Sequence, residues 1–206
     1  MLRTTRKSRP HPIARGARAG LGAVVIGASA GGVRALLQLL SGFNADYRLP
    51  IIVVVHLAKD RESQLAPLFQ TRTAMTVCEA ADKQAIQPGT VYFAGPGYHL
   101  SVERDHTFSL SCEEPVYWSR PAIDVLMDSA AEAYGAALVG ILLMGASADG
   151  ASGLAHIAAR GGVTVVQEPG DAEVATMPEA ALARHQPDYI LKLGAIRTLL
   201  LEFDRA

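Results

Sequence analysis

The chain has 206 residues, 50% of them hydrophobic, and a formal net charge of -1 at pH 7. This length predicts one domain with a sizeable core. No apolar run reaches the ~18–20 residues of a membrane span, which argues against direct membrane insertion. The two cysteines lack the spacing of a metal or redox motif, and no apolar signal region opens the chain, so we expect a reduced, cytoplasmic protein.

Charge is distributed unevenly along the chain. The first 20 residues hold six basic side chains and no acidic one, whereas the rest holds 13 basic and 20 acidic side chains. The first segment lacks apolar periodicity and contains prolines and glycines. We therefore expect residues 1–20 to form a disordered basic tail and residues 21–206 to form the folded domain. A solvated leader is the simplest interpretation of the tail; an anion-binding arm and an organelle transit peptide stay open.

Strand-like and helix-like runs alternate from residue 22 onwards. The strand-like runs are continuous in Val, Ile and Leu, which is typical of parallel strands covered on both faces. They are expected at 22–27, 51–55, 75–79, 90–94, 137–143, 163–167 and 188–191. The helical patterns are expected at 32–41, 62–71, 121–134, 151–160, 178–185 and 195–203.

The segment 98–112, YHLSVERDHTFSLSC, departs from this alternation. Two alternating runs flank ERDH, which predicts an antiparallel β-hairpin at one edge of the sheet. The whole pattern predicts a single α/β domain, with a doubly wound, mostly parallel sheet inside three αβα layers.

Three chemically active side chains follow three of the predicted strands. Ser29 follows the first strand, His56 the second, and Asp149 the strand at 137–143. In a doubly wound sheet the active crevice lies at the carboxyl ends of the strands. A hydroxyl, an imidazole and a carboxylate are therefore expected to converge there.

The turn that carries Ser29 resembles two known devices. A phosphate-binding loop needs Gly-Lys-Ser/Thr, which is absent from the chain. The dinucleotide fingerprint needs a glycine where Ser29 stands and an acid where His56 stands. Residues 27–31 read GASAG, which matches the G-x-S-x-G of a nucleophile elbow. The sequence favours a serine nucleophile over a phosphate site.

The chemistry of such a group gives each side chain a role. Ser29 would attack a carbonyl carbon, His56 would accept its proton, and Asp149 would hold the imidazole tautomer. We expect Ser29 Oγ near His56 Nε2, with Asp149 on the other ring nitrogen. The alternatives are a buried structural histidine for His56 and, for Asp149, an N-cap on the helix expected at 151–160.

The other histidines fit structural roles better. His11 lies in the tail and His185 near the end of the chain, and both are expected to be solvated. His106 in the hairpin turn and His156 on a helix are expected at the surface or in packing. His99 starts the hairpin and is expected to be structural.

Asp124 and Asp128 lie one turn apart on a predicted helix. No cluster of histidine or cysteine joins them, so they predict helix surface or capping rather than a metal site. We expect no metal, no cofactor and no nucleic-acid partner.

Seven segments, in order, resemble the catalytic domain of the bacterial chemotaxis receptor methylesterases, the protein-glutamate methylesterase and protein-glutamine glutaminase family. They span residues 22–192 and read VVIGASAGG, VVHLA, PGTVYFAGPGYHL, SRPAIDVLMDSAA, GASADGASGL, GGVTVVQEP and MPEAALA. The resemblance implies a doubly wound sheet with an antiparallel hairpin. It also implies hydrolysis of γ-glutamyl methyl esters on the helical cytoplasmic domain of methylated receptors, with deamidation of certain glutamines as a second activity.

By the family's motifs, Ser29 is the nucleophile, His56 the base and Asp149 the orienting carboxylate. Backbone N–H groups of Ala30 and Ala146 are then expected to bind the oxyanion. The resemblance also implies that residues 21–206 form a methylesterase-like catalytic domain.

The sequence departs from the family pattern in three ways. Twenty residues are too few for the receiver domain that typically precedes the catalytic domain, so we expect a free-standing catalytic unit. Ser147 replaces a glycine of the family loop, and a positive φ there would cost about 1 kcal/mol or more. Ala30, Val55 and Ala58 also differ from the usual residues.

Two functions remain open at this point. One is a serine esterase that acts on a receptor-like protein. The other is a non-catalytic or regulatory domain that keeps the fold and binds a signalling partner. The presence of Ser29, His56 and Asp149 together favours the esterase.

Overall fold

The computed structural model describes residues 20–56 and 63–205, so the predictions for the basic tail lie outside the described residues except at Gly20. A seven-stranded parallel sheet forms the centre, in the order β3-β4-β2-β1-β7-β8-β9. Its strands are β1 (Ala23–Ala28), β2 (Ile51–Val55), β3 (Thr76–Glu79), β4 (Thr90–Phe93), β7 (Leu138–Leu142), β8 (Val163–Gln167) and β9 (Tyr189–Leu191).

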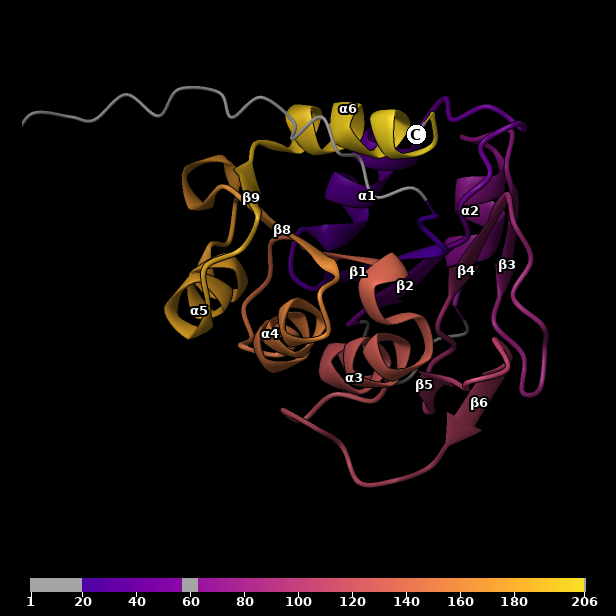
Figure 1. The fold of residues 1–206 in the computed structure, drawn as a ribbon, viewed down its shortest axis with the longest axis horizontal. Helices are drawn as coiled ribbons and strands as arrows, with labels where there is room; N and C mark the ends of the chain where they lie inside the picture. The colour runs from indigo at the N-terminus through magenta and orange to yellow at the C-terminus, as the bar shows by residue number, and fades with distance from the viewer. Residues whose placement is uncertain (1–19, 57–62, 206) are drawn as a thin grey trace, which may run out of the picture.

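Helices cover both faces of this sheet (Figure 1). α1, α2 and α6 pack on one face, and α3, α4 and α5 pack on the other. They are α1 (Gly32–Leu40), α2 (Leu65–Gln70), α3 (Ile123–Tyr134), α4 (Ala151–Ala159), α5 (Thr176–Arg184) and α6 (Leu193–Phe203), with short 3₁₀ turns at η1 (Gly135–Ala137) and η2 (Pro169–Asp171). The predicted doubly wound, three-layer α/β fold is confirmed.

The predicted hairpin is also confirmed. Strands β5 (His99–Val102) and β6 (Phe108–Ser111) pair antiparallel. They form a separate two-stranded sheet, which packs against α3 instead of extending the main sheet. Val102 N donates to Ser129 Oγ of α3 at 3.1 Å, so the hairpin is attached to a helix of the outer layer.

Burial on both faces explains why the central strands read as continuous apolar runs. Every residue of β1, β2, β7 and β8 is buried. Along β1, Val24 and Ile26 belong to the core under α1 and α6, whereas Ala23 and Val25 belong to the core under α3 and α4. Both faces of the strand are therefore apolar.

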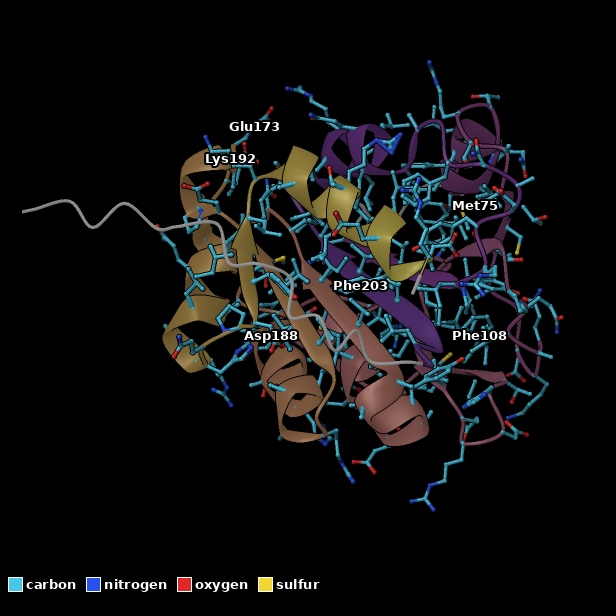
Figure 2. All side chains as sticks on the ribbon, turned by 45° about the horizontal axis from the view of Figure 1, so that its top comes forward. Met75, Phe108, Glu173, Asp188, Lys192 and Phe203 are labelled. Carbon is cyan, nitrogen blue, oxygen red and sulfur yellow. The ribbon has the colours of Figure 1, made fainter. Side chains whose placement is uncertain are left out.

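The strand order reverses at β1, which lies between β2 and β7. Such a reversal opens a crevice at the carboxyl ends of the neighbouring strands. Figure 2 shows Glu173 and Lys192, which follow β8 and β9, at the same end of the sheet, with Asp188 before β9 at the other end. The loop after β8 thus lies at the carboxyl edge.

The element boundaries differ from the predicted ones by up to three residues. α3 begins at Ile123 rather than at residue 121, and α5 and α6 begin two residues earlier than predicted. Within the described ranges, no helix combines the length and apolar character that a membrane crossing requires.

Candidate active site

Ser29 stands directly after β1, at the point where the strand order reverses. Its N–H donates to Met144 O at 3.0 Å, and its own carbonyl accepts from Gly32 N at 2.8 Å. Gly31 N-caps α1 with φ +81°, a conformation that glycine adopts without strain. The chain therefore turns sharply from strand to helix at Ser29, as the elbow prediction requires.

Gly145 lets the loop after β7 pass close to this serine. A Cβ atom at Gly145 would lie 2.7 Å from Ser29 Cβ and 2.8 Å from Met177 Cε. Real Cβ atoms essentially never approach so closely. The small residue is needed for the loop and the serine to occupy adjacent space.

His56 is the register neighbour of Ser29. Strands β1 and β2 pair in parallel with Ala28 opposite Val55, and His56 N donates to Ala28 O at 3.1 Å. Adjacent strands lie about 4.8 Å apart, so the residues that follow this pair leave the sheet side by side. In the described part of the chain the Ser29 hydroxyl has no hydrogen bond, so none joins it to His56.

Asp149 holds the imidazole of His56. Asp149 Oδ2 lies 2.8 Å from His56 Nε2, and the Asp149 side chain is fully buried. A carboxylate can only accept, so the neutral ring carries its proton on Nε2 and leaves Nδ1 as an acceptor. We expected the opposite orientation, with Nε2 toward the serine; that expectation was wrong. The ring orientation depends on the direction from which the carboxylate approaches, and that direction follows from the loop's three-dimensional course.

The same carboxylate also caps a helix, but not the one that follows it. Asp149 Oδ2 accepts from Ile123 N at 2.7 Å, and Asp149 Oδ1 accepts from Asp124 N at 2.9 Å. Both amides belong to the first turn of α3, where a negative charge is favourable. The predicted N-cap role on the following helix is wrong, because Gly150 occupies that position with φ +92°.

Ser147 causes no backbone strain in this loop. It is absent from the residues with positive φ among those described, so the predicted cost does not arise. Its Oγ accepts from Asp149 N at 3.1 Å. The side chain that replaces a glycine therefore supports the backbone next to the buried carboxylate.

Two backbone N–H groups stay available beside the serine. Neither Ala30 N nor Ala146 N has a hydrogen-bond partner among the described residues. Ser29 N is already bonded to Met144 O. Unpaired N–H groups at a strand-to-helix turn are the donors that an oxyanion hole requires.

Gln167 is a site residue that the sequence analysis missed. It is fully buried, and its Oε1 accepts from Met144 N at 3.0 Å. Its Nε2 donates to Asp171 Oδ2 at 3.0 Å, and the same oxygen accepts from Leu193 N. Gln167 thereby fixes the residue whose carbonyl binds Ser29. Its position, a polar residue at the end of an apolar strand, is the same signal that identified His56.

A small cavity lies next to the serine turn. Its volume is about 130 Å³, and Gly31, Met144, Arg34 and Glu173 help to line it. Arg34 and Glu173 form an ion pair with Arg34 Nη1 2.5 Å from Glu173 Oε1. The cavity is smaller than the ~300–1,000 Å³ of a typical small-molecule pocket, so it suits a single side chain at most.

Two of the other histidines match their predicted structural roles. His99 is buried: its Nδ1 accepts from Ala122 N at 3.2 Å and its Nε2 lies 3.1 Å from Glu114 O. His156 pairs at the surface with Asp128 and Glu132 of α3.

His106 and His185 complete the described histidines. His106 stacks on Tyr134, with 4.2 Å between ring centroids, so it has the predicted packing role. His185 was expected to be solvated, but both of its ring nitrogens are buried without a partner in the described structure. Burial lowers the pKa of His185. His11 lies outside the described residues.

The two paired aspartates behave differently from one another. Asp128 is exposed and bonds His156 Nδ1 at 3.0 Å. Asp124 is only 7% exposed, and its Oδ1 accepts from Gly153 N at 2.7 Å. Burial raises the pKa of Asp124 to about 6, with smaller contributions from the charges of Asp149 and Asp128. The sequence predicted either helix surface or capping for this pair. Asp124 is buried and has the capping role.

A doubly wound sheet with a serine turn and a bonded histidine–carboxylate pair at its switch point has the arrangement of the α/β class, whose sites lie at the carboxyl ends of the strands. The sequence matches the family model described as CheB methylesterase over residues 24–200. The chain belongs to this family, and the predicted resemblance is confirmed.

Named relatives agree with this assignment. A putative protein-glutamate methylesterase/protein-glutamine glutaminase of Leptospira interrogans is 40% identical over 89% of this chain and 95% of its own length. A protein of the same function name from Clostridium acetobutylicum is 32% identical over 89% of this chain, but the match spans 53% of that longer protein. The crystal structure of the Thermotoga maritima CheB methylesterase catalytic domain superposes with a TM-score of 0.84 at 30% identity, covering 89% of this chain and 98% of the other.

Proposed function

We propose that this chain is a protein-glutamate methylesterase that hydrolyses γ-glutamyl methyl esters on methylated chemotaxis receptors. Residues 21–206 form its catalytic domain, with Ser29 as nucleophile, His56 as general base and Asp149 as the orienting carboxylate. The single observation that carries the proposal is the bond between His56 Nε2 and buried Asp149 beside the register neighbour Ser29, in a chain of this family.

Acylation uses the ring nitrogen that Asp149 leaves unbonded. Ser29 Oγ attacks the ester carbonyl carbon, and its proton passes to His56 Nδ1. The imidazolium that forms is stabilised by the Asp149 carboxylate, which keeps the proton on Nε2. The N–H groups of Ala30 and Ala146 bind the oxygen that gains negative charge.

The tetrahedral intermediate then collapses. The C–O bond to the methoxy group breaks, His56 Nδ1 returns its proton to that oxygen, and methanol leaves. A water molecule, deprotonated by the same nitrogen, attacks the γ-glutamyl ester of Ser29. The C–O bond to Ser29 Oγ then breaks, His56 Nδ1 returns the proton to that oxygen, and the free glutamate side chain is released. With a glutamine substrate the same steps expel ammonia, which accounts for the second activity in the relatives' names.

A helical receptor segment is the substrate form that we propose. A helix is about 10 Å across with its side chains, so it has to lie over the carboxyl edge of the sheet while one side chain reaches Ser29. Small soluble esters are then expected to be poor substrates, since they lack the remote contacts that position the carbonyl. Such receptor segments lie in the cytoplasm, where we place this protein.

The experiment is a methanol-release assay on methylated receptor. Ser29→Ala and His56→Ala are expected to lower turnover by roughly 10³-fold or more, and Asp149→Ala by less, because the carboxylate orients but does not react. Ser101→Ala, in hairpin strand β5, is the matched control and keeps wild-type turnover. Equal turnover in wild type and Ser29→Ala would refute the proposal and favour the non-catalytic binding domain.

Control by the basic tail is tested in the same assay. We expect deletion of residues 1–20 to leave turnover nearly unchanged, because contacts between exposed opposite charges are weak and screened by salt. We also expect no dependence on acetyl phosphate. A large gain in turnover on truncation would show that the tail covers the crevice.

A further inference from the structure

Two buried carboxylates cross-link the first turns of α3 and α4. Asp149, which precedes α4, accepts from the backbone of Ile123 and Asp124 in α3. Asp124, in the first turn of α3, accepts from Gly153 N in α4 at 2.7 Å. Each helix start therefore supplies the carboxylate that caps the other. We call this arrangement the aspartate latch.

The two helices approach closely enough for the latch because glycine stands at the contact. A Cβ atom at Gly153 would lie 2.5 Å from Met127 Cβ and 3.2 Å from both Asp124 Cα and Asp124 O. A Cβ atom at Gly150 would lie 2.7 Å from Ile123 Cγ2. Backbone and side chain of α3 thus fill the space, and the latch has one tight geometry.

Only one half of the latch touches the imidazole. Asp149 Oδ2 is shared between His56 Nε2 at 2.8 Å and Ile123 N at 2.7 Å. Any shift of α4 relative to α3 would move this oxygen away from one of its two donors. The bond that resists such a shift is the one from Gly153 N to Asp124 Oδ1.

We propose that Asp124 is a positioning residue for the esterase reaction: by holding the start of α4 against α3, it keeps Asp149 in line with His56. The inference rests on the proposed function for its catalytic consequence. Its structural consequence, a fixed bond between Asp149 and His56, does not depend on that function.

The charges around Asp124 show that its role is hydrogen-bond acceptance. The ionisable groups that interact with it are Asp149 from the loop before α4 and Asp128 from its own helix, both acidic, and His56 lies beyond Asp149. Repulsion from these carboxylates and burial both disfavour a charge on Asp124. A neutral acceptor of the same shape should therefore serve the latch as well as the carboxylate does.

The test compares two side chains with the same number of non-hydrogen atoms. Asp124→Asn keeps an oxygen acceptor, whereas Asp124→Leu removes it. The matched control is Asp128, one turn along the same helix but exposed and paired with His156. Turnover of methylated receptor gives kcat and KM, and NMR of the His56 ring gives its pKa and its Nε2 proton signal, which need no turnover.

Asp124→Leu is expected to lower kcat by about 10- to 100-fold with KM within about threefold, because the base is misaligned while substrate contacts stay. The same variant is expected to lose the Nε2 proton signal of His56. Asp124→Asn is expected to keep kcat within about threefold of wild type and to keep the signal, and Asp128→Leu is expected to change neither.

Three outcomes would overturn the inference: a folded Asp124→Leu with wild-type kcat and His56 signal, an Asp124→Asn as impaired as Asp124→Leu, or an equal loss in Asp128→Leu. If Asp124→Leu does not fold, Gly153→Ala presses on the same contact from α4 and should give the same loss in kcat and signal. Wild-type behaviour of Gly153→Ala would then overturn the inference. An inactive wild type whose His56 signal still depends on Asp124 would refute the proposed function and leave the latch intact.

Discussion

Two irregular segments of this protein place different kinds of residue in the left-handed backbone conformation. The site segment, residues 143–153, is mostly buried, and its left-handed residue is Gly150. The aromatic turn, residues 116–119, exposes its two central residues, which are also its left-handed ones: Tyr117 at φ 47° and Trp118 at φ 62°. Both segments lie close to the start of α3.

The aromatic turn joins its ends as a two-residue hairpin. Val116 N donates to Ser119 O at 3.2 Å, and Ser119 N donates to Val116 O at 2.9 Å. Positive φ at both central residues defines a type I′ turn, which favours Asn-Gly. Tyr117 and Trp118 are 49% and 93% exposed, so burial does not offset the strain of the turn.

The two segments differ in whether the residue at positive φ is the type that tolerates this conformation. In the site segment a glycine takes the left-handed position, and the buried polar side chain has all its partners. In the aromatic turn two bulky side chains take that position, and the described fold gains little from them. Substitutions in the first segment should therefore cost stability, and substitutions in the second should add it.

The largest expected effect is the removal of Asp149. Asp149→Ala leaves the N–H groups of Ile123 and Asp124 without acceptors inside the protein. We expect the free energy of unfolding to fall by about 3–5 kcal/mol, measured by urea denaturation. Asp128→Ala, which removes an exposed carboxylate of α3, is the control and should change it by less than about 1 kcal/mol.

The next largest effect on stability is expected for replacement of Gly150, the left-handed residue of the site segment. Gly150→Ala forces an L-residue to φ +92° and brings Cβ within 2.5 Å of Leu142 Cδ1, so we expect a loss of about 2–4 kcal/mol. Gly194, near the start of α6, has open space around its Cβ position and no positive φ. Gly194→Ala should add about 0.5–1 kcal/mol through helix propensity. Losses of equal size in both variants would contradict the comparison.

Lowering the pH should stabilise the fold by protonating the buried carboxylate of Asp124. Burial raises the pKa of Asp124 to about 6 in the folded state, above the ordinary value of 3.8. Between these two values the folded protein binds more protons than the unfolded chain, so this carboxyl makes stability rise as the pH falls. From pH 7 to pH 4 the wild type should gain about 2 kcal/mol relative to Asp124→Asn. Parallel stability curves for the two proteins would contradict this.

The smallest expected effect has the opposite sign. Replacing Tyr117 with Asn and Trp118 with Gly places the preferred residues in the type I′ turn. We expect the free energy of unfolding to rise by about 1 kcal/mol, because the left-handed strain is removed and little buried area is lost. Trp118→Ala alone keeps a non-glycine residue at φ 62° and should change stability very little. A loss of stability in the double variant would show that the aromatic side chains support the fold.

Sequence patterns were sufficient for the fold, and they singled out the residues of the candidate site. Continuous apolar runs predicted the strands because β1, β2, β7 and β8 are buried on both faces. The rule that site residues follow such strands predicted Ser29, His56 and Asp149 as candidates, and the structure joins two of them, His56 and Asp149, by a hydrogen bond. Both signals are local, so they can be read without knowing the tertiary structure.

Features that depend on how distant parts of the chain pack together could not be predicted from local sequence patterns. The orientation of the His56 ring, and the helix that Asp149 caps, follow from the packing of α4 on α3. The buried state of His185 and the regular φ of Ser147 also depend on neighbours distant in the sequence. The role of Gln167 needed the observation that its strand ends beside Met144.

The position of β1 has a consequence for how the protein is made. β1 pairs on one side with β2, which follows soon after, but on the other side Ala23 pairs with Leu138 and Gly27 with Leu142. A chain still attached to the ribosome carries one open, apolar edge on this strand until β7 has been synthesised. Such an edge is a template for pairing with other chains. The strand that ends before Ser29 is thus translated long before its second edge is protected, and chaperone binding to nascent chains should end when β7 emerges.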